Sequence, residues 1–375
     1  MYRNKFQSGL RVVLVTLVAL GLLAAGASAQ TAPYTRTVIV NKVGSATANG
    51  AALLVALSGL SPAPSSGDRW VIKIEGGFYD VGTTPIVLQP FVNLEGSGVY
   101  TTIVRGSVGP PPGYLLGGVV QGASNSELRD LTIQCISSAS VPSCQAISLD
   151  TAHARLTDVR VLSGGTGTGS HWGIRTFDSQ PTLDRVQVLS DAAGGTDNYG
   201  IVFSGSSTMN ITRSSVIARY SPNNNWAILL KGNLNNSTLR DSEITASHGT
   251  HAAGIYYLES TTSNSLTIDN TTIVASAATT AVGLGRDVVV DNSRPTISFR
   301  HGRLAGSTHG FDHLGATVDL VNTEISGSAT RVAANVARIG GTKLQGTGII
   351  FGSYSLVCAG TFDGNYTFYA STCPP

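Results

Sequence analysis

The sequence predicts an all-β fold: a single-stranded right-handed parallel β-helix with coils of about 27 residues and an N-terminal helical cap. Short apolar segments recur at a nearly constant interval along the chain. Each interval alternates apolar and polar residues and has no helical apolar period. Glycine occupies 44 positions, and the segments between strands are rich in Ser, Thr and Asn, which is typical of a chain that turns often.

The first repeated segment defines the coil length. It begins 27 residues apart at every step, at Ala146, Gly173, Gly200, Ala227, Gly254 and Ala281. A unit of this length without a helix excludes leucine-rich, ankyrin and tetratricopeptide repeats, and it fits one coil of a parallel β-solenoid. Coils stack at about 4.8 Å, so the second residues of the segments are predicted to form one inward column: Ile147, Ile174, Ile201, Ile228, Ile255 and Val282.

A second series keeps pace with the first, in steps of 27 to 29 residues. Its apolar members are Leu128, Leu156, Leu183, Ile211, Leu239 and Ile268. Two residues after each stands a polar residue, and this polar column is predicted to lie at a turn: Asp130, Asp158, Arg185, Arg213, Asp241 and Asn270.

The N-terminus reads as an export signal over residues 1–29. It has a basic start, an apolar run over residues 12–23, and Ala27-Ser28-Ala29 as a cleavage site. We therefore expect a secreted or periplasmic protein with no membrane insertion after signal cleavage. The β-helix domain is predicted over 30–375, with the cap and first coils at 37–106, regular coils at 128–350 and a disulfide-tied end at 351–375. The cap helix is expected over Ala51–Leu60.

The four cysteines allow three connectivities, of which the two local pairs are favoured by sequence proximity: Cys135 with Cys144, and Cys358 with Cys373. The second pair closes a 15-residue loop, which chain entropy values at about 3 kcal/mol. No histidine stands at zinc-site spacing near either pair, so no metal is predicted, and no cofactor.

The charge balance argues against nucleic acid or an anionic membrane surface as a partner. Residues 1–29 hold three basic and no acidic residues, which leaves 24 − 3 = 21 basic against 22 acidic side chains. This is no footprint for nucleic acid or an anionic membrane surface.

Several motifs resemble a known superfamily. The order helix, "VIKIEGGFYD", "VNLEGSG" and "TTIVRG" resembles the opening of pectin-lyase-like proteins, especially the pectin methylesterase branch. The C-terminal "CAGTFDGNYTFYASTC" resembles a cysteine-bounded tail of secreted bacterial β-helix proteins. The resemblance implies a β-helix and, for an enzyme, a carbohydrate esterase or polysaccharide lyase.

The catalytic motifs of that branch are largely missing. Pectin methylesterases use two aspartates, an arginine and glutamines in one cleft, and only Gln145, in a strand similar to the family's QAVAL, has a counterpart. The strand that best matches the family's nucleophile segment, Tyr199–Gly205, contains no aspartate. Whether the protein is an enzyme stays open at this point.

One series stands above this background. Trp172, Tyr199 and Trp226 precede the repeated segment in three successive coils, so they are expected to stack as an aromatic ladder. Each lies two residues before an inward isoleucine, and residues two apart on a strand face the same side, which favours an interior position. The preceding His171 and Asn198 end variable loops, which instead indicates a corner where parity fails, with the rings outward.

The loops over 163–170, 190–197, 219–224 and 247–252 are expected to project from one edge of the solenoid. The predicted substrate-binding set is Trp172, Tyr199, Trp226, His171, Arg175, Asp197, Asn198 and Gln145. The favoured function is interaction with a polysaccharide or cell-surface glycan, as a binding module or a diverged carbohydrate-active enzyme. The alternative is a structural or surface-contact solenoid without catalytic activity.

Overall fold

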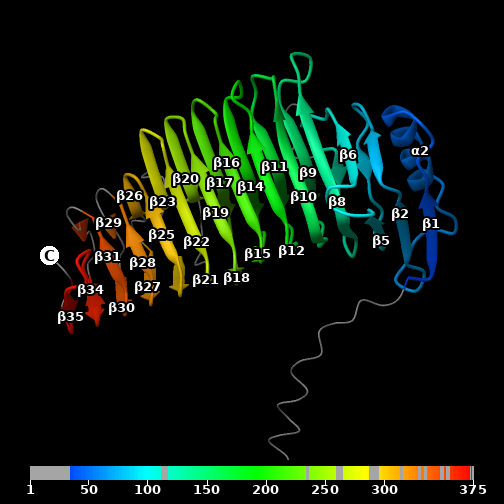
Figure 1. The fold of residues 1–375 in the computed structure, drawn as a ribbon. Helices are drawn as coiled ribbons and strands as arrows, with labels where there is room; N and C mark the ends of the chain where they lie inside the picture. The colour runs from blue at the N-terminus through cyan, green and yellow to red at the C-terminus, as the bar shows by residue number, and fades with distance from the viewer. Residues whose placement is uncertain are drawn as a thin grey trace, which may run out of the picture.

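The computed structural model describes residues 34–110, 117–233, 236–258, 265–286, 295–312, 316–327, 331–332, 336–346, 350–351, 355–371 and 373. The predicted signal peptide lies outside them. Strands stack side by side along one axis, with the single helix of the described residues, α2 (Ala46–Ser58), at the N-terminal end (Figure 1). Within these residues no helix is long and apolar enough to cross a membrane.

The coils form a right-handed parallel β-helix, as predicted. Each regular coil contributes one strand to a 9-stranded sheet, sheet B, and two to a 24-stranded sheet, sheet A. The strands of sheet B are β4 (Ile86–Val87), β7 (Val120–Gln121), β9 (Cys144–Asp150), β11 (His171–Phe177), β14 (Asp197–Gly205), β17 (Asn224–Gly232), β20 (His251–Tyr257), β23 (Thr280–Arg286) and β26 (His309–Asp312).

Sheet A consists of two stacks joined at a corner. The stack before the corner holds β1 (Arg36–Val40), β2 (Trp70–Ile74), β5 (Val92–Glu95), β8 (Glu127–Ser137), β10 (Arg155–Gly165), β12 (Thr182–Asp184), β15 (Asn210–Thr212), β18 (Ser237–Arg240), β21 (Ser265–Asp269), β24 (Thr296–Arg300), β27 (Thr317–Val321), β30 (Val336–Gly340) and β33 (Ser355–Ala359). The stack after it holds the second halves of β8 and β10, with β3 (Gly77–Asp80), β6 (Thr102–Gly106), β13 (Gln187–Asp191), β16 (Ser215–Arg219), β19 (Glu243–Ser247), β22 (Thr272–Ser276), β25 (Arg303–Gly306), β28 (Glu324–Ser326), β31 (Lys343–Gln345) and β34 (Thr361–Phe362).

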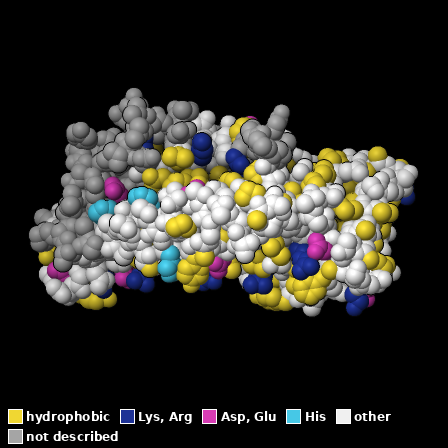
Figure 2. Space-filling model, turned by 90° about the horizontal axis from the view of Figure 1, so that it is seen from above, with side chains coloured by type: hydrophobic (Ala, Val, Ile, Leu, Met, Phe, Trp, Pro, Cys, Tyr) yellow, Lys and Arg dark blue, Asp and Glu magenta, His cyan; other side chains and the backbone are white. Residues whose placement is uncertain are grey.

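Two smaller pairings complete the strands. β35 (Phe368–Tyr369) pairs antiparallel with β34, and β29 (Arg331–Val332) pairs with β32 (Ile350–Phe351). The face in Figure 2 is mostly uncharged, with scattered charged side chains, in line with a chain of 12% charged residues.

The inward columns are confirmed except at one step. The register aligns Ile147, Ile174, Ile201, Ile228 and Ile255 in sheet B, all fully buried. The predicted sixth member, Val282, is wrong: Leu284 pairs with Ile255, and Val282 pairs with Ala253.

The reason for this shift is a longer coil. Ile228 pairs with Ile255 at an interval of 27, whereas Leu239 pairs with Ile268 at 29. Two additional residues therefore enter the chain between β20 and β21, and every later pairing in that coil is displaced by two.

The polar column lies at the corner of sheet A, as predicted. Asp130, Asp158, Arg185, Arg213, Asp241 and Asn270 all have a left-handed backbone, with φ between 47° and 56°. His301 and Asn322 continue the series. One left-handed residue turns the chain between the two stacks, and we call these eight residues the corner column.

Hydroxyl groups satisfy the backbone at this corner. The Ser214 hydroxyl accepts a hydrogen bond from the Val186 amide (3.0 Å), and the Ser242 hydroxyl accepts one from the Ser214 amide (3.1 Å). Each hydroxyl also donates to a carbonyl two residues before it in its own coil. These side chains take the place of strand-to-strand bonds where the turn interrupts the ladder.

The N-terminal cap is present but begins earlier than predicted. α2 starts at Ala46 because the Ser45 hydroxyl accepts a hydrogen bond from the Ala48 amide, which makes Ser45 the N-cap. Leu53 and Leu57 point into the core and cover its open end. Both predicted disulfides are present, Cys135–Cys144 and Cys358–Cys373.

Candidate functional site

The aromatic ladder lies on the outer face of sheet B. His171 and Ile174 are fully buried, whereas Trp172 is partly exposed. Gly173 also faces inward, because a Cβ built there would overlap the buried Val188 side chain. Two consecutive inward positions break the alternation of the strand, and this turns Trp172 outward. The same break recurs at Gly200, so Tyr199 is also outward and partly exposed.

The rings contact one another across coils. Trp172 and Tyr199 are nearly parallel, with centroids 5.8 Å apart, and Tyr199 meets Trp226 edge-on at 5.4 Å. Trp226 is in turn stacked on Tyr256 at 4.8 Å. Because stacked rings turn their faces toward each other, a ligand on this surface meets mainly ring edges along the ladder.

Arg175 extends the ladder sideways on the same strand. Its guanidinium lies 5.5 Å from the centroid of the Trp172 ring. The side chain is half-buried, and its Nε atom is buried without a hydrogen-bond partner. Among the described residues no carboxylate lies within ion-pair distance of it. Burial lowers the pKa of the guanidinium, so the site holds a desolvated cation that lacks a counter-charge.

Three of the predicted site residues lie beneath the surface instead. His171, Asn198 and Gln145 have no exposed area. His171 shares a 2.7 Å hydrogen bond with the Ser137 hydroxyl, and burial lowers its pKa to about 4. The amide of Asn198 donates to the Ala192 carbonyl at 3.3 Å, which ties down the preceding loop. These side chains support the site from below.

Asp197 stands at the edge of the same face. Its carboxylate accepts hydrogen bonds from Asn224 (2.6 Å) and from the Ser170 hydroxyl (3.2 Å), so it links three successive loops. Burial, together with the nearby Asp197, raises the pKa of the Tyr199 phenol. The loops leave sheet A along one edge, as predicted, and they hydrogen-bond to each other through Thr196 and Thr250.

The ladder ends at a hollow that the sequence did not reveal. At the next position of its column the aromatic residue is replaced by Ala253, and Gly285 follows Tyr256 in the neighbouring column. The small side chains leave a cavity of about 450 Å³. Its polar lining comes from Asn224, His251, Thr280, Arg286, His309 and Asp312. Asn224 pairs with His251 at the ordinary interval, and the two-residue shift then places Thr280 next to His251.

Among the described residues, no three His, Cys, Asp or Glu side chains are grouped so that they could hold a metal ion. The site is built from aromatic rings, the Arg175 cation without a counter-charge among the described residues, the Asp197 carboxylate at its edge and uncharged hydrogen-bonding groups. Such a surface can bind a polar polymer that carries both apolar ring faces and anionic groups.

Fold and site together define a right-handed parallel β-helix with an aromatic ladder on the outer face of one sheet. The sequence itself matches no family model and no curated protein. Among solved structures it is similar to the Dettilon tailspike protein, with a TM-score of 0.57 and 12% identity over 86% of this chain and 68% of that one.

Two other solved structures match with lower TM-scores. The pectate lyase Pel9A has a TM-score of 0.46 and 9% identity, over 88% of this chain and 80% of that one. The catalytic domain of a GH87 α-1,3-glucanase has a TM-score of 0.46 and 12% identity, over 88% and 67%. At these identities the comparisons concern the fold alone.

Proposed function

We propose that the protein binds a polysaccharide along the outer face of sheet B, and that the polymer carries anionic groups. The observation that supports this is Arg175, a half-buried cation beside the Trp172 ring without a counter-charge among the described residues. Leaving such a group unpaired is costly, and a ligand carboxylate or sulfate would remove that cost.

The ladder supports an extended ligand. Trp172, Tyr199 and Trp226 repeat at the coil spacing, so they offer an aromatic ring at three successive steps along the axis. A polymer lying parallel to the axis would meet all three, and solenoids provide such long surfaces. The two disulfides fit an oxidising compartment, where extracellular glycans occur.

No catalytic step forms part of the proposal. The pectin methylesterase resemblance requires an aspartate on the strand that here runs from Tyr199 to Gly205, and none is present. A second function, a purely structural solenoid, is favoured by the stacking of Trp172 on Tyr199, because stacked faces are closed to sugar rings.

Affinity electrophoresis of the mature protein in gels that contain polygalacturonate, alginate, heparin or dextran tests the proposal. We expect retardation by an acidic polymer. Arg175→Gln should weaken it about tenfold or more, since charge-assisted hydrogen bonds contribute about 1.5–3 kcal/mol. Arg300→Gln, at an exposed arginine of sheet A, is the matched control and should have little effect.

Trp172→Ala/Trp226→Ala, with its fold checked by circular dichroism, should also lose the retardation. If the wild-type protein migrates normally in every acidic gel, the binding proposal is wrong and the structural solenoid is favoured. Equal losses in Arg175→Gln and Arg300→Gln would mean that binding depends on overall charge, not on this site.

A further inference from the structure

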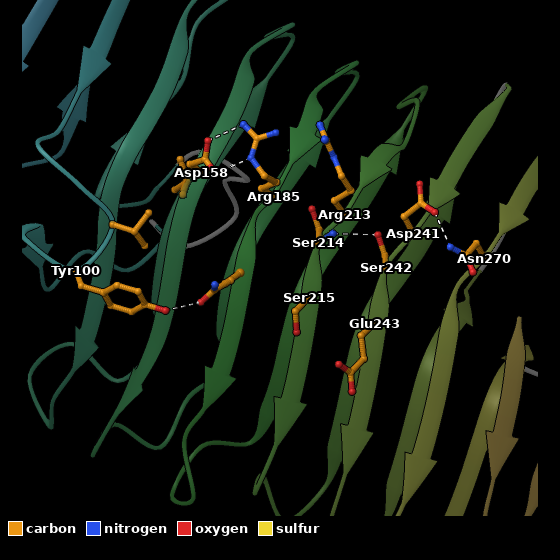
Figure 3. A pocket seen from close by; sticks show the side chains of 13 residues that line it. Tyr100, Asp158, Arg185, Arg213, Ser214, Ser215, Asp241, Ser242, Glu243 and Asn270 are labelled. Atoms are coloured by element: carbon orange, nitrogen blue, oxygen red, sulfur yellow. Dashed lines mark hydrogen bonds and ion pairs between the residues drawn. The ribbon is translucent and has the colours of Figure 1, made fainter.

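A groove runs along the corner of sheet A. Two hollows of about 620 and 430 Å³ lie along the corner column and share Asn270. One wall is the corner column itself, and the other is formed by outward residues of the following stack: Gln187, Ser215, Glu243, Thr272, Arg303 and Glu324. We call this the corner groove, and Figure 3 shows its first part.

The groove is separate from the ladder. In each coil the chain leaves sheet B, passes through one stack of sheet A, turns at the corner and returns through the other stack. The corner therefore lies across the coil from sheet B, and a ligand in the groove would not contact the aromatic ladder.

The arginines of the groove are already paired. Arg185 binds the Asp158 carboxylate through two hydrogen bonds of 2.7 and 2.6 Å, and it also contacts Asp184. Arg213 binds the same Asp184 through bonds of 2.9 and 2.7 Å, and the Asp184 side chain is only 9% exposed. Neither cation is therefore available to attract an anionic ligand.

Two carboxylates of the groove, in contrast, have no cationic partner among the described residues. Glu243 is exposed, and its side chain has no ion pair or hydrogen bond among the described residues. In Figure 3 it lies on the strand next to Ser215, while Asp241 accepts a 2.7 Å hydrogen bond from Asn270. Two carboxylates without a cationic partner repel a polyanion, but they are strong acceptors for hydroxyl groups.

Tyr100 provides an aromatic surface at one end of the groove. It is 67% exposed, yet its hydroxyl bonds Gln187 at 3.3 Å and the Arg160 guanidinium lies 5.5 Å from its ring centroid. Figure 3 shows the ring reaching toward the groove from the loop before β6. An exposed aromatic ring held by contacts on two sides is pre-organised for stacking, which lowers the entropy cost of binding.

We propose that the corner groove is a second glycan-binding site, specific for an uncharged, hydroxyl-rich polysaccharide that lies along the axis. Tyr100 stacks on a sugar ring at one end, and Glu243 and Asp241 accept hydrogen bonds from sugar hydroxyls. The Asn270 amide and the Ser215 hydroxyl can donate hydrogen bonds to sugar oxygens. Because successive coils are about 4.8 Å apart, groups on neighbouring coils follow one another at that spacing along the groove.

Affinity electrophoresis with four neutral polymers, dextran, laminarin, xyloglucan and galactomannan, tests this site. We expect at least one to retard the wild-type protein. Tyr100→Ala/Glu243→Ala should weaken that retardation about tenfold, because it removes both the ring and the unpaired acceptor. Both residues are exposed, so the variant should keep its fold, which circular dichroism checks.

Two controls separate this site from the ladder. Trp172→Ala/Trp226→Ala should bind the neutral polymer as the wild-type protein does, and Tyr100→Ala/Glu243→Ala should bind acidic polymers unchanged. No retardation by any neutral polymer, or an equal loss in the ladder variant, would overturn the inference. A fifth gel contains chitosan; retardation in that gel alone would also overturn the inference, since the groove would then be a site for cationic sugars. Failure of the ladder proposal would appear in the acidic gels alone.

Discussion

The hydroxyl of Ser242 allows a direct test of how the corner is stabilised. It accepts a hydrogen bond from the buried Ser214 amide at 3.1 Å and donates to the Arg240 carbonyl at 2.6 Å. Ser242→Ala removes both bonds and leaves the amide without its acceptor. A buried polar group without a partner costs about 1–3 kcal/mol, so the free energy of unfolding should fall by that amount.

Urea denaturation followed by circular dichroism measures this loss, and hydrogen exchange at the Ser214 amide locates it. Ser215→Ala is the matched control: this serine is adjacent in the chain, faces the groove and makes no side-chain hydrogen bond among the described residues. Its effect should stay within about 0.5 kcal/mol. If Ser242→Ala costs no more than the control, or leaves exchange at Ser214 unchanged, hydroxyl groups do not hold the corner.

Two further predictions concern pH and the first disulfide. Because burial lowers the pKa of His171 to about 4 from 6.5, only the unfolded chain takes up its proton between these values. The free energy of unfolding should therefore fall as the pH drops through this window, by at most about 3 kcal/mol. His171→Asn, the residue found at the paired position 198, should show less of this loss in urea melts at pH 7 and 4.5. Replacing Cys135 and Cys144 by Ala opens a loop with a sequence separation of 9. Thermal melts should show that the free energy of unfolding falls by about 2.5 kcal/mol. Selective reduction of this disulfide in the wild-type protein, with the second disulfide intact, should reproduce the loss.

The repeat was predictable because stacked coils of nearly equal length place equivalent residues at a nearly constant interval from Leu128 to Ile268. Leu128, Leu156 and Leu183 pair in register, as their spacing indicates. The sequence also contained a sign of the error at Val282. In the second repeated series the step from Leu239 to Ile268 is 29 residues, longer than any other step. The first series keeps its interval of 27 by coincidence, because Val282 and Leu284 are both apolar.

The orientation of the aromatic ladder could not be predicted from alternation alone. Strict alternation along the strand would place Trp172 on the same inward side as Ile174. In the structure, however, Gly173 and Ile174 both face inward. Only small residues stand at this position in the ladder, Gly173, Gly200 and Ala227, and at Gly173 even a Cβ would overlap Val188. The sequence signals for the outward orientation of the rings were the glycine after Trp172 and the loop ends at His171 and Asn198, which indicated a corner.

The sequence by itself determined the architecture: coil length, inward columns, the turn position of the polar column, the helical cap and both disulfide pairs. These are properties of one coil or of its repetition, so a local pattern encodes them. The tertiary structure alone decided which polar groups are satisfied. Arg185 and Arg213 are paired because Asp158 and Asp184 occupy neighbouring coils, whereas Arg175 has no such neighbour among the described residues. Contacts between side chains on different coils depend on register, exposure and rotamer, which no single repeat contains.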